Sequence, residues 1–281
     1  MRVKVDDARL FFDVDGAKLR PDGPQMREVP TLLLLHGGPG FDHSIWKPRF
    51  TELTDVAQIV YLDHRGNCRS EGWKDPQRLN LAQWGDDVRR FCEALEIEKP
   101  IVMGTSFGGM VALAYATRHP EHCGKVILCS TAARIRLDRS LDVFERLGGA
   151  EAKEIAKAFF ENPGRGTMDA YVEKCFPLYT HAPRDPNLIP RTVMNSDLTA
   201  AFFKVDIKQF NFLPELHKIR CQTLVVGGDD DPITPIADQE DIVAAIPAGL
   251  VRFERFAQAG HAVVDDAPAA FFKLLREFIL A

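Results

Sequence analysis

One serine of the sequence stands in a pattern that is typical of a catalytic nucleophile. Ser106 is the centre of a Gly-x-Ser-x-Gly pattern that begins at Gly104 and ends at Gly108. An apolar, strand-like run precedes the pattern and a helix-like run follows it. A strand that turns sharply into a helix crowds the positions two before and two after the central residue, which therefore favour glycine. The pattern predicts that Ser106 projects from this turn as a nucleophile. The alternative is an unreactive serine in a plain glycine turn.

A serine hydroxyl is a weak nucleophile, so a base must lie beside it. Of the eight histidines, His261 follows the last expected strand and precedes the last expected helix, on a loop at the carboxyl edge of the sheet. Other histidines have less suitable places. His36 belongs to a glycine turn, His119 and His122 lie at a helix end, and His217 follows a loop proline. We therefore predict His261 as the base, with a packed loop histidine as the alternative.

The base in turn needs an acid that holds its tautomer. Three consecutive aspartates, residues 229–231, follow the expected strand Thr223–Val226. Asp231 precedes Pro232, which restricts the aspartate to extended backbone and fixes the turn. We predict Asp231 as the acid, with Asp230 as the alternative. Because consecutive carboxylates point in diverging directions and no histidine is close to them in the sequence, no metal is predicted at this cluster.

A second glycine-rich turn, His36–Gly40, directly follows the apolar strand Thr31–Leu35. Backbone N–H groups in such a turn can face a ligand. A tetrahedral acyl intermediate needs two donors for its oxyanion, and the candidates are the N–H groups of Gly38 and Phe107. A phosphate-binding loop is the alternative, but the spacing differs from that motif and no suitable Lys-Ser/Thr pair follows.

Short apolar runs alternate with amphipathic segments of helix length, which indicates a mostly parallel sheet covered on both faces. The segment from Val3 to Val14 alternates more and could form an antiparallel edge hairpin. The expected buried strands are Thr31–Leu35, Ile59–Leu62, Ile101–Gly104, Val126–Cys129, Thr223–Val226 and Val251–Phe256. The expected helices are Leu81–Leu95, Gly108–Arg118, Ile236–Ala245 and Pro268–Leu280.

The strand rhythm stops in the middle of the chain. Between Ala132 and Leu216, turns containing Gly or Pro separate helical patterns such as Leu141–Leu147 and Glu151–Phe160. We predict a core formed by residues 1–131 and 216–281, and a helical lid formed by residues 132–215. Such an insertion would cover the carboxyl ends of the strands, where open α/β sheets bind ligands.

The chain order Ser106, Asp231, His261 is that of the α/β-hydrolases. Within that superfamily the core resembles the proline iminopeptidase branch, over about residues 31–120 and again from 213 to the end. The stretches that carry the resemblance are His36–Gly40, Leu62–Ser70, Ala114–Glu121 and residues 228–235. The resemblance implies an α/β-hydrolase fold with a mostly parallel eight-stranded sheet, helices on both faces and a helical lid. Acyl transfer by Ser106 and His261 would require no cofactor. It also implies that Asp63, Arg65 and Arg69 are structural ion-pair residues.

The sequence departs from that branch where the substrate would bind. Iminopeptidases usually carry Trp after the nucleophile, where this chain has Phe107, and their lid has a Trp-Glu signature that binds the free amine of the substrate. No Trp lies beyond Trp84. Carboxylates of the expected lid could still bind an amine, although a solvated helix face is the simpler interpretation; they are Glu145, Glu154, Glu161 and Glu173. Phenylalanines could instead line an apolar pocket, or simply pack lid against core; they are Phe144, Phe159, Phe160, Phe176, Phe202 and Phe203.

We therefore expect a serine hydrolase that cleaves a carboxylic ester or lactone of a small, largely apolar substrate. A prolyl aminopeptidase is the alternative, and a ligand receptor that keeps a hydrolase fold is a second one. Dehalogenases and epoxide hydrolases need a nucleophilic aspartate at position 106, where serine stands. The sequence indicates no oligomeric state.

Composition argues against a nucleic acid as partner, and we expect a small-molecule substrate. With a net charge of −5, an isoelectric point near 5.9 and no cluster of Lys and Arg, nucleic acid is not expected as a partner. No run of about 18 apolar residues predicts a membrane span. The N-terminus lacks the apolar stretch of a secretory signal, and the six cysteines form no CxxC pair. We expect reduced thiols and a cytoplasmic protein.

Overall fold

The structure is a computed structural model that describes residues 1–204 and 209–281; residues 205–208, within the expected lid, lie outside the described residues. Eight strands form one sheet in the order β1-β2-β6-β5-β7-β8-β9-β10. Their bounds are β1 (Arg2–Val5), β2 (Ala8–Asp15), β5 (Thr31–Leu35), β6 (Gln58–Leu62), β7 (Ile101–Thr105), β8 (Lys125–Cys129), β9 (Gln222–Gly228) and β10 (Val251–Phe256). β1 and β2 run antiparallel to their neighbours, and all pairs from β6 to β10 are parallel. The predicted eight-stranded, mostly parallel sheet is confirmed.

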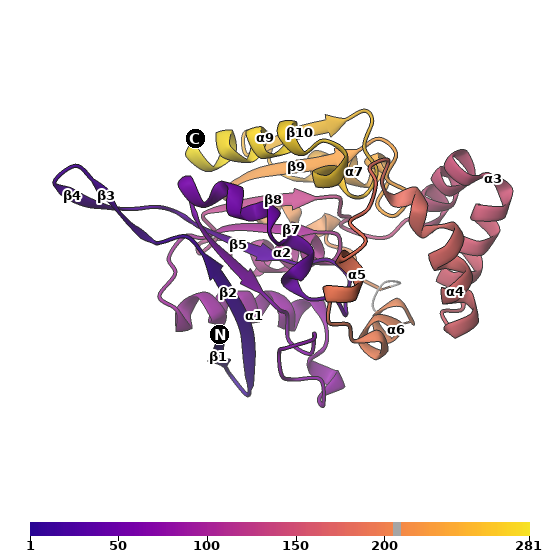
Figure 1. The fold of residues 1–281 in the computed structure, drawn as a ribbon, viewed down its shortest axis with the longest axis horizontal. Coiled ribbons are helices and arrows are strands. Elements are labelled where there is room, and N and C mark those ends of the chain that lie inside the picture. Colours follow the sequence, from indigo (N-terminus) through magenta and orange to yellow (C-terminus); the bar gives the residue numbers. More distant parts are fainter. Residues whose placement is uncertain (205–208) are drawn as a thin grey trace.

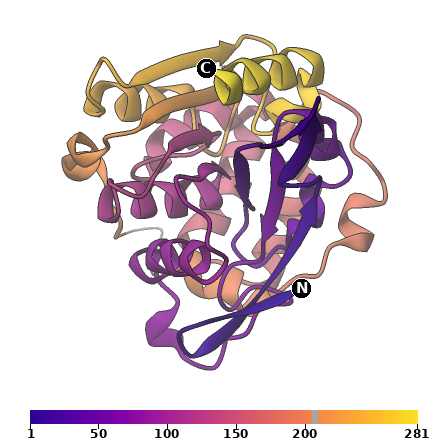
Figure 2. The same cartoon turned by 90° about the vertical axis from the view of Figure 1, so that its left-hand side faces the viewer.

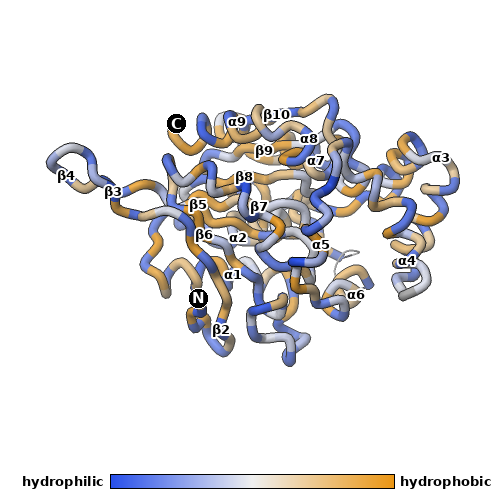
Figure 3. The backbone as a smooth tube through the Cα atoms, in the orientation of Figure 1, coloured by the Kyte–Doolittle hydropathy of each residue, from blue (hydrophilic) through white to orange (hydrophobic). Residues whose placement is uncertain are grey.

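The central strands are buried on both faces because both sets of alternating side chains are apolar. In β5, Leu33 and Leu35 belong to one hydrophobic cluster, whereas Leu32 and Leu34 belong to another on the opposite face. Figure 3 shows the middle of the sheet as mostly hydrophobic. The sheet therefore has two core layers, one beneath each set of helices.

Helices cover both faces, as predicted (Figure 1 and Figure 2). The cluster that contains Leu33 takes in the apolar side chains of α1 (Leu81–Ala94), α2 (Phe107–Arg118) and α7 (Ile236–Ala245). The opposite cluster takes in the 3-10 helices η1 (His43–Trp46) and η2 (Arg49–Asp55), α8 (Val263–Asp266) and α9 (Pro268–Leu280). The four predicted core helices agree with α1, α2, α7 and α9 to within one residue at each end.

Two features of the sheet differ from the sequence-based expectation. β10 was expected to be a buried strand, but its residues are only partly buried because it is the last strand of the sheet. A separate hairpin of β3 (Leu19–Asp22) and β4 (Gln25–Glu28) was not expected, since its residues are mostly polar and exposed. This hairpin projects from the body of the protein (Figure 1).

Between β8 and β9 the described residues form helices and loops without a strand. The helices are α3 (Leu137–Glu161), α4 (Arg165–Lys174), η4 (Phe176–Tyr179), α5 (Leu188–Arg191), α6 (Ser196–Lys204) and η6 (Leu213–Lys218). α3 is interrupted at Gly149, whose φ of 75° and ψ of −177° are not helical, so two helical parts flank it as the sequence predicts. Figure 1 shows α3 and α4 on the side toward which β8 and β9 point. The division of the chain into core and lid stays a prediction.

In the described ranges, no helix combines the length and the apolar character that a membrane span requires.

Candidate active site

The turn between β7 and α2 holds Ser106 in a strained conformation. Its φ of 53° and ψ of −122° lie outside the regions that most residues adopt. A Cβ atom on Gly104 would collide with the backbone oxygen of Gly108, and one on Gly108 would collide with the carbonyl oxygen of Leu35. Both outer residues of the pattern must therefore be glycine. The Ser106 N–H is directed at two carbonyl oxygens at the end of β8 and just beyond it, at 3.1 Å from Cys129 O and 3.0 Å from Ser130 O.

His261 is joined to Asp231. The Nδ1 atom of His261 lies 2.8 Å from Asp231 Oδ2 and 3.0 Å from Oδ1. The carboxylate is buried and also accepts hydrogen bonds from Ile233 N at 2.8 Å, Thr234 N at 3.0 Å and Thr234 Oγ1 at 2.8 Å. With Nδ1–H donating to the carboxylate, a neutral His261 has its free lone pair on Nε2.

The alternative acid, Asp230, is paired with other side chains. It accepts hydrogen bonds from Arg146 Nη1 at 2.5 Å and from His181 Nε2 at 2.9 Å. Burial opposes ionisation of Asp230, but the hydrogen bonds and charges of Arg146 and His181 outweigh it and lower the pKa of the carboxyl. Asp230 therefore links the aspartate loop to α3, and Asp231 alone of the three aspartates contacts His261.

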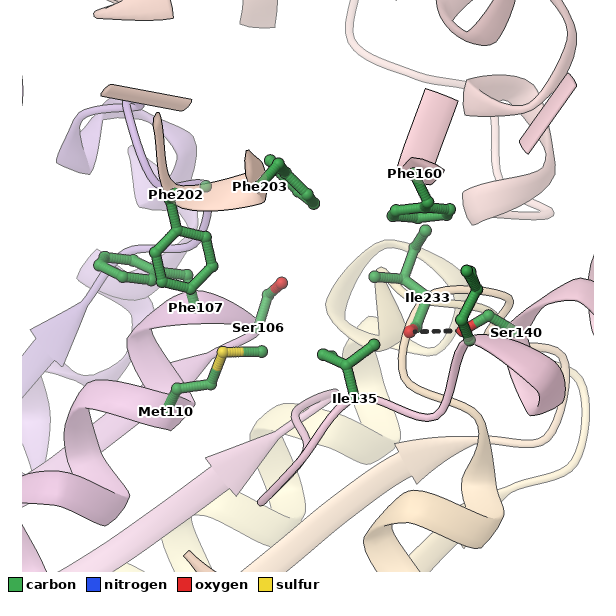
Figure 4. A pocket seen from close by; sticks show the side chains of 11 residues that line it. Ser106, Phe107, Met110, Ile135, Ser140, Phe160, Phe202, Phe203 and Ile233 are labelled. Atoms are coloured by element: carbon green, nitrogen blue, oxygen red, sulfur yellow. Dashed lines mark hydrogen bonds between the residues drawn. The ribbon is translucent and has the colours of Figure 1, made fainter. Parts of the chain in front are cut away.

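Ser106 lies at the wall of an apolar pocket (Figure 4). The space between the lining atoms is about 390 Å³, part of it open to solvent. The lining residues are Gly38, Ser106, Phe107, Met110, Ile135, Leu137, Ser140, Phe160, Phe202, Phe203 and Ile233. None of these described residues is charged. The hydroxyl of Ser106 points into the space between Phe203 and Ile233 (Figure 4).

The two residues predicted to hold an oxyanion, Gly38 and Phe107, line this pocket together with Ser106. Phe107 is the first residue of α2, and the first N–H groups of a helix have no partner within the helix. Neither the Gly38 N–H nor the Phe107 N–H is bonded to an acceptor in residues 1–204 or 209–281. Gly38 has a φ of 116°, a conformation that favours glycine.

Half of the six phenylalanines considered from the sequence line the pocket. Phe160, Phe202 and Phe203 do so, and Phe202 also packs edge-on against Phe107 with ring centres 5.2 Å apart. Phe144 and Phe159 do not line the pocket; they lie in the hydrophobic cluster between α3 and α4, which Phe160 and Phe203 also contact. The ring of Phe176 stacks under the guanidinium of Arg184, at 3.6 Å from its centre.

The four carboxylates of the expected lid do not reach the pocket. They are all exposed and none is among the lining residues; they are Glu145, Glu154, Glu161 and Glu173. Glu145 pairs with Lys153, with 2.6 Å between Oε2 and Nζ. The solvated-face interpretation fits them.

Sequence reasoning missed five lining residues, which are Met110, Ile135, Leu137, Ser140 and Ile233. Their positions contain a usable signal. Met110 lies one helical turn after Ser106, and Ile233 lies two residues after Asp231. Ile135, Leu137 and Ser140 follow β8, the strand next to that of the nucleophile. The carboxyl ends of adjacent parallel strands meet at one edge, so these residues could have been found from that rule.

The charged residues of the Asp63–Arg69 stretch form ion pairs, as the resemblance implied. Buried Arg65 donates to Asp87 with 2.6 Å between Nε and Oδ2, and Arg69 pairs with Asp42. Asp63 accepts a hydrogen bond from His43 Nδ1 at 2.8 Å.

No group of three or more metal-binding side chains occurs among the residues that the structure describes.

The comparisons with known proteins agree with this architecture. The α/β-hydrolase fold family matches residues 30–268. "Putative carbamate hydrolase RutD" of Rhizobium rhizogenes is 26% identical over 97% of this chain and 98% of its own length. Proline iminopeptidase PfmaB of Pestalotiopsis fici is 28% identical, covering 91% of this chain and 95% of its own. The 3-oxoadipate enol-lactonase 1 of Acinetobacter baylyi is 25% identical over 85% of each chain.

Among solved structures, a proline iminopeptidase from Mycobacterium smegmatis superposes with a TM-score of 0.79 at 20% identity, covering 99% of this chain and 97% of its own. This match shows a shared fold. The predicted resemblance to the proline iminopeptidase branch is confirmed, alongside similarity to proteins named as carbamate hydrolases and enol-lactonases. The chain belongs to the α/β-hydrolase fold family.

Proposed function

We propose that this protein is a serine hydrolase that cleaves a carboxylic ester or lactone of a small, largely apolar substrate. The observation that carries the proposal is the pocket at Ser106, whose lining side chains are apolar apart from two serines. Such a wall favours an uncharged acyl or alcohol group, because a buried charge without a partner loses its hydration. One of the two serines, Ser140, donates its hydroxyl to Ile233 O at 3.1 Å and so adds little polarity.

The proposed reaction is acyl transfer to water. Ser106 Oγ attacks the substrate carbonyl while His261 Nε2 takes the hydroxyl proton, and Asp231 stabilises the imidazolium that forms. The N–H groups of Gly38 and Phe107 bind the oxyanion. His261 then protonates the leaving alcohol, and water attacks the acyl-enzyme with His261 again as base. The reaction needs no cofactor.

In the structure Ser106 Oγ is bonded to none of the described residues. Catalytic hydrogen bonds are often long or poorly aligned before substrate binds, so we expect the hydrogen bond between Ser106 and His261 to form in the complex. In the proposal, residues 132–215 form the lid, because Phe160, Phe202 and Phe203 of that segment cover the pocket.

A prolyl aminopeptidase is the second candidate, because Proline iminopeptidase PfmaB is similar over most of its length. That activity requires carboxylates that neutralise the substrate ammonium. Four carboxylates of the expected lid are exposed and do not line the pocket; they are Glu145, Glu154, Glu161 and Glu173.

The name of the enol-lactonase relative supports a lactone as the substrate. The carbamate hydrolases suggest a carbamate as a further acyl substrate.

A ligand receptor with a hydrolase fold is a third candidate, which would bind a small molecule without turning it over.

We place the protein in the cytoplasm, since all six cysteines are free thiols and suit a reducing compartment. We propose a small molecule as its partner.

A substrate panel on the purified protein and on Ser106→Ala tests the proposal. The panel contains p-nitrophenyl esters, lactones, an alkyl carbamate, a proline amide with a free amine and the same amide acetylated. The expected result is the highest kcat/KM for a neutral ester or lactone, lost in Ser106→Ala. Release of proline that acetylation abolishes would support the aminopeptidase, and tight binding without turnover would support the receptor.

A fluorophosphonate probe gives an independent readout of the nucleophile. It should label the wild-type protein once, because only Ser106 is expected to have both a base and oxyanion donors. Labelling that persists in Ser106→Ala would overturn the assignment.

A further inference from the structure

The carboxylate of Asp266 joins two segments that are far apart in the sequence. Its Oδ1 atom accepts hydrogen bonds from Thr180 Oγ1 at 2.6 Å, from His181 N at 2.8 Å and from Ala182 N at 2.8 Å. Its Oδ2 atom accepts one from Gly260 N at 2.8 Å. Asp266 therefore bridges the two segments, because Oδ1 accepts from residues 180–182 and Oδ2 accepts from Gly260. Hydrogen bonds to an ionised carboxylate are roughly twice as strong as those between neutral groups.

Gly260, which donates to Oδ2, directly precedes His261 in the sequence. Ala262, which follows His261, donates its N–H to Tyr179 O at 3.3 Å. A Cβ atom on Gly260 would lie 2.5 Å from Tyr179 O, so the two backbones are in close contact. The Tyr179 ring meets the His261 ring edge-on, with centres 5.4 Å apart. The segment 179–182 therefore packs around the base.

The same segment also holds the aspartate loop. His181 Nε2 lies 2.9 Å from Asp230 Oδ2, and Asp230 is the neighbour of Asp231. Both loops that carry partners of the proposed triad are thus bound to one short stretch of the helical insertion. Asp266 accepts three of the hydrogen bonds that keep this stretch in place, and it accepts a fourth from Gly260 of the His261 loop.

We propose that Asp266 is a positioning residue, which fixes His261 for proton transfer with Ser106 by holding segment 179–182 of the insertion against the His261 loop. The inference rests on the proposed function. An amide at position 266 cannot accept on both sides, because its NH₂ group would face an N–H or hydroxyl donor. One of the two segments would then shift. A displacement of about 1 Å at a reacting group can cost about 10²-fold in rate.

The test compares three variants of the full chain. Asp266→Asn removes one acceptor, and Thr180→Val removes a single donor with little change in shape. Asp265→Asn is the matched control: it changes the adjacent carboxylate, which pairs with Arg49 and accepts none of these four hydrogen bonds. For each variant, kcat and KM on a neutral ester, the rate of fluorophosphonate labelling, the melting temperature and the low-field proton resonance of the His261 Nδ1–H are measured.

For Asp266→Asn we expect kcat to fall about 10²-fold with KM little changed, labelling to slow in parallel and the low-field resonance to shift or broaden. Thr180→Val should show a smaller fall in kcat, and Asp265→Asn should resemble the wild type. The proposal would be overturned if Asp266→Asn had a lower melting temperature but an unchanged kcat and an unchanged His261 resonance. It would also be overturned if kcat fell equally in Asp265→Asn. If Asp266→Asn does not fold, Thr180→Val decides by the same criteria.

The two proposals fail in different ways. If the wild-type protein neither hydrolyses an ester nor reacts with the fluorophosphonate, the proposed function is wrong. The resonance of His261 is observed without turnover, and its persistence unchanged in Asp266→Asn would show that Asp266 does not position the histidine.

Discussion

His261 Nδ1 lies within hydrogen-bond distance of both carboxylate oxygens of Asp231, at 2.8 and 3.0 Å. The two residues come from loops that follow adjacent parallel strands, β9 and β10. Asp231 is buried, and three donors of its own turn also bind its oxygens. The aspartate therefore fixes both the orientation and the tautomer of the imidazole, so that Nε2 is the basic atom.

The first prediction separates the two aspartates that the sequence left open. In Asp231→Asn the amide no longer selects the required tautomer of His261, and we expect kcat on a neutral ester to fall about 10⁴-fold. Asp230→Asn is the matched control. Its carboxyl binds Arg146 and His181, so we expect a much smaller loss. Steady-state rates at pH 8 measure both. A larger loss in Asp230→Asn would transfer the role to that residue.

The second prediction concerns Gly108, the glycine two residues after the nucleophile. In Gly108→Ala the new Cβ would collide with the carbonyl oxygen of Leu35 at the carboxyl end of β5. Because neither backbone can move freely, we expect the free energy of unfolding to fall by about 3 kcal/mol. Urea denaturation measures it.

Gly166→Ala is the control for that substitution. Position 166 lies in α4, and a Cβ atom there would have no neighbour within 4 Å. Stability should stay the same or rise by about 0.5 kcal/mol. Equal losses in the two variants would show that the close contact at Gly108 does not limit stability.

Local patterns explain why most of the fold was predictable. The apolar run Thr31–Leu35 is too short for a typical helix and so indicates a strand buried on both faces. The glycines around Ser106 indicate the sharp turn because a Cβ atom does not fit at either position. The order of Ser106, Asp231 and His261 then places all three at one sheet edge, since the strands before them are parallel.

Contacts between distant segments could not be predicted. Asp266 resembles any acidic residue at a helix start, and its four donors are 6 to 86 residues away in the sequence. The phenylalanines of the insertion are equally apolar whether they face the pocket, as Phe203 does, or the interior of the insertion, as Phe159 does. Only the packing of α3, α4 and α6 separates these two groups.

The third prediction uses that difference. Phe203→Ala should lengthen the proposed pocket, so that it can bury about two more methylenes of a long acyl chain. These methylenes contribute about 1.6 kcal/mol. We therefore expect kcat/KM for an octanoate ester, relative to that for a butyrate ester, to rise about tenfold. Phe176→Ala is the control, since that ring packs on Arg184 and does not line the pocket. The measurement is kcat/KM for p-nitrophenyl esters of increasing chain length. An equal change in both variants would exclude a direct contact of Phe203 with the acyl chain.

The last prediction concerns the pH dependence of stability. Asp238 lies on α7 and is buried, and its Oδ1 accepts a hydrogen bond from Arg139 of α3 at 2.6 Å. Its Oδ2 has no hydrogen-bond partner in the described part of the chain. Burial is the main cause that raises the pKa of this carboxyl from 3.8 to about 6, although Arg139 opposes it.

The protonated form of Asp238 is therefore favoured by folding, and this contribution to stability is full below pH 3.8 and is lost as the pH rises through about 6. Asp238→Asn mimics the protonated form at every pH. We expect the stability of this variant, relative to the wild type, to increase by about 2 kcal/mol between pH 4.5 and pH 7.5. Urea denaturation of both proteins at the two pH values measures this difference. A relative stability that stays constant, or that decreases toward pH 7.5, would show that Arg139 stabilises an ionised Asp238 in the folded protein.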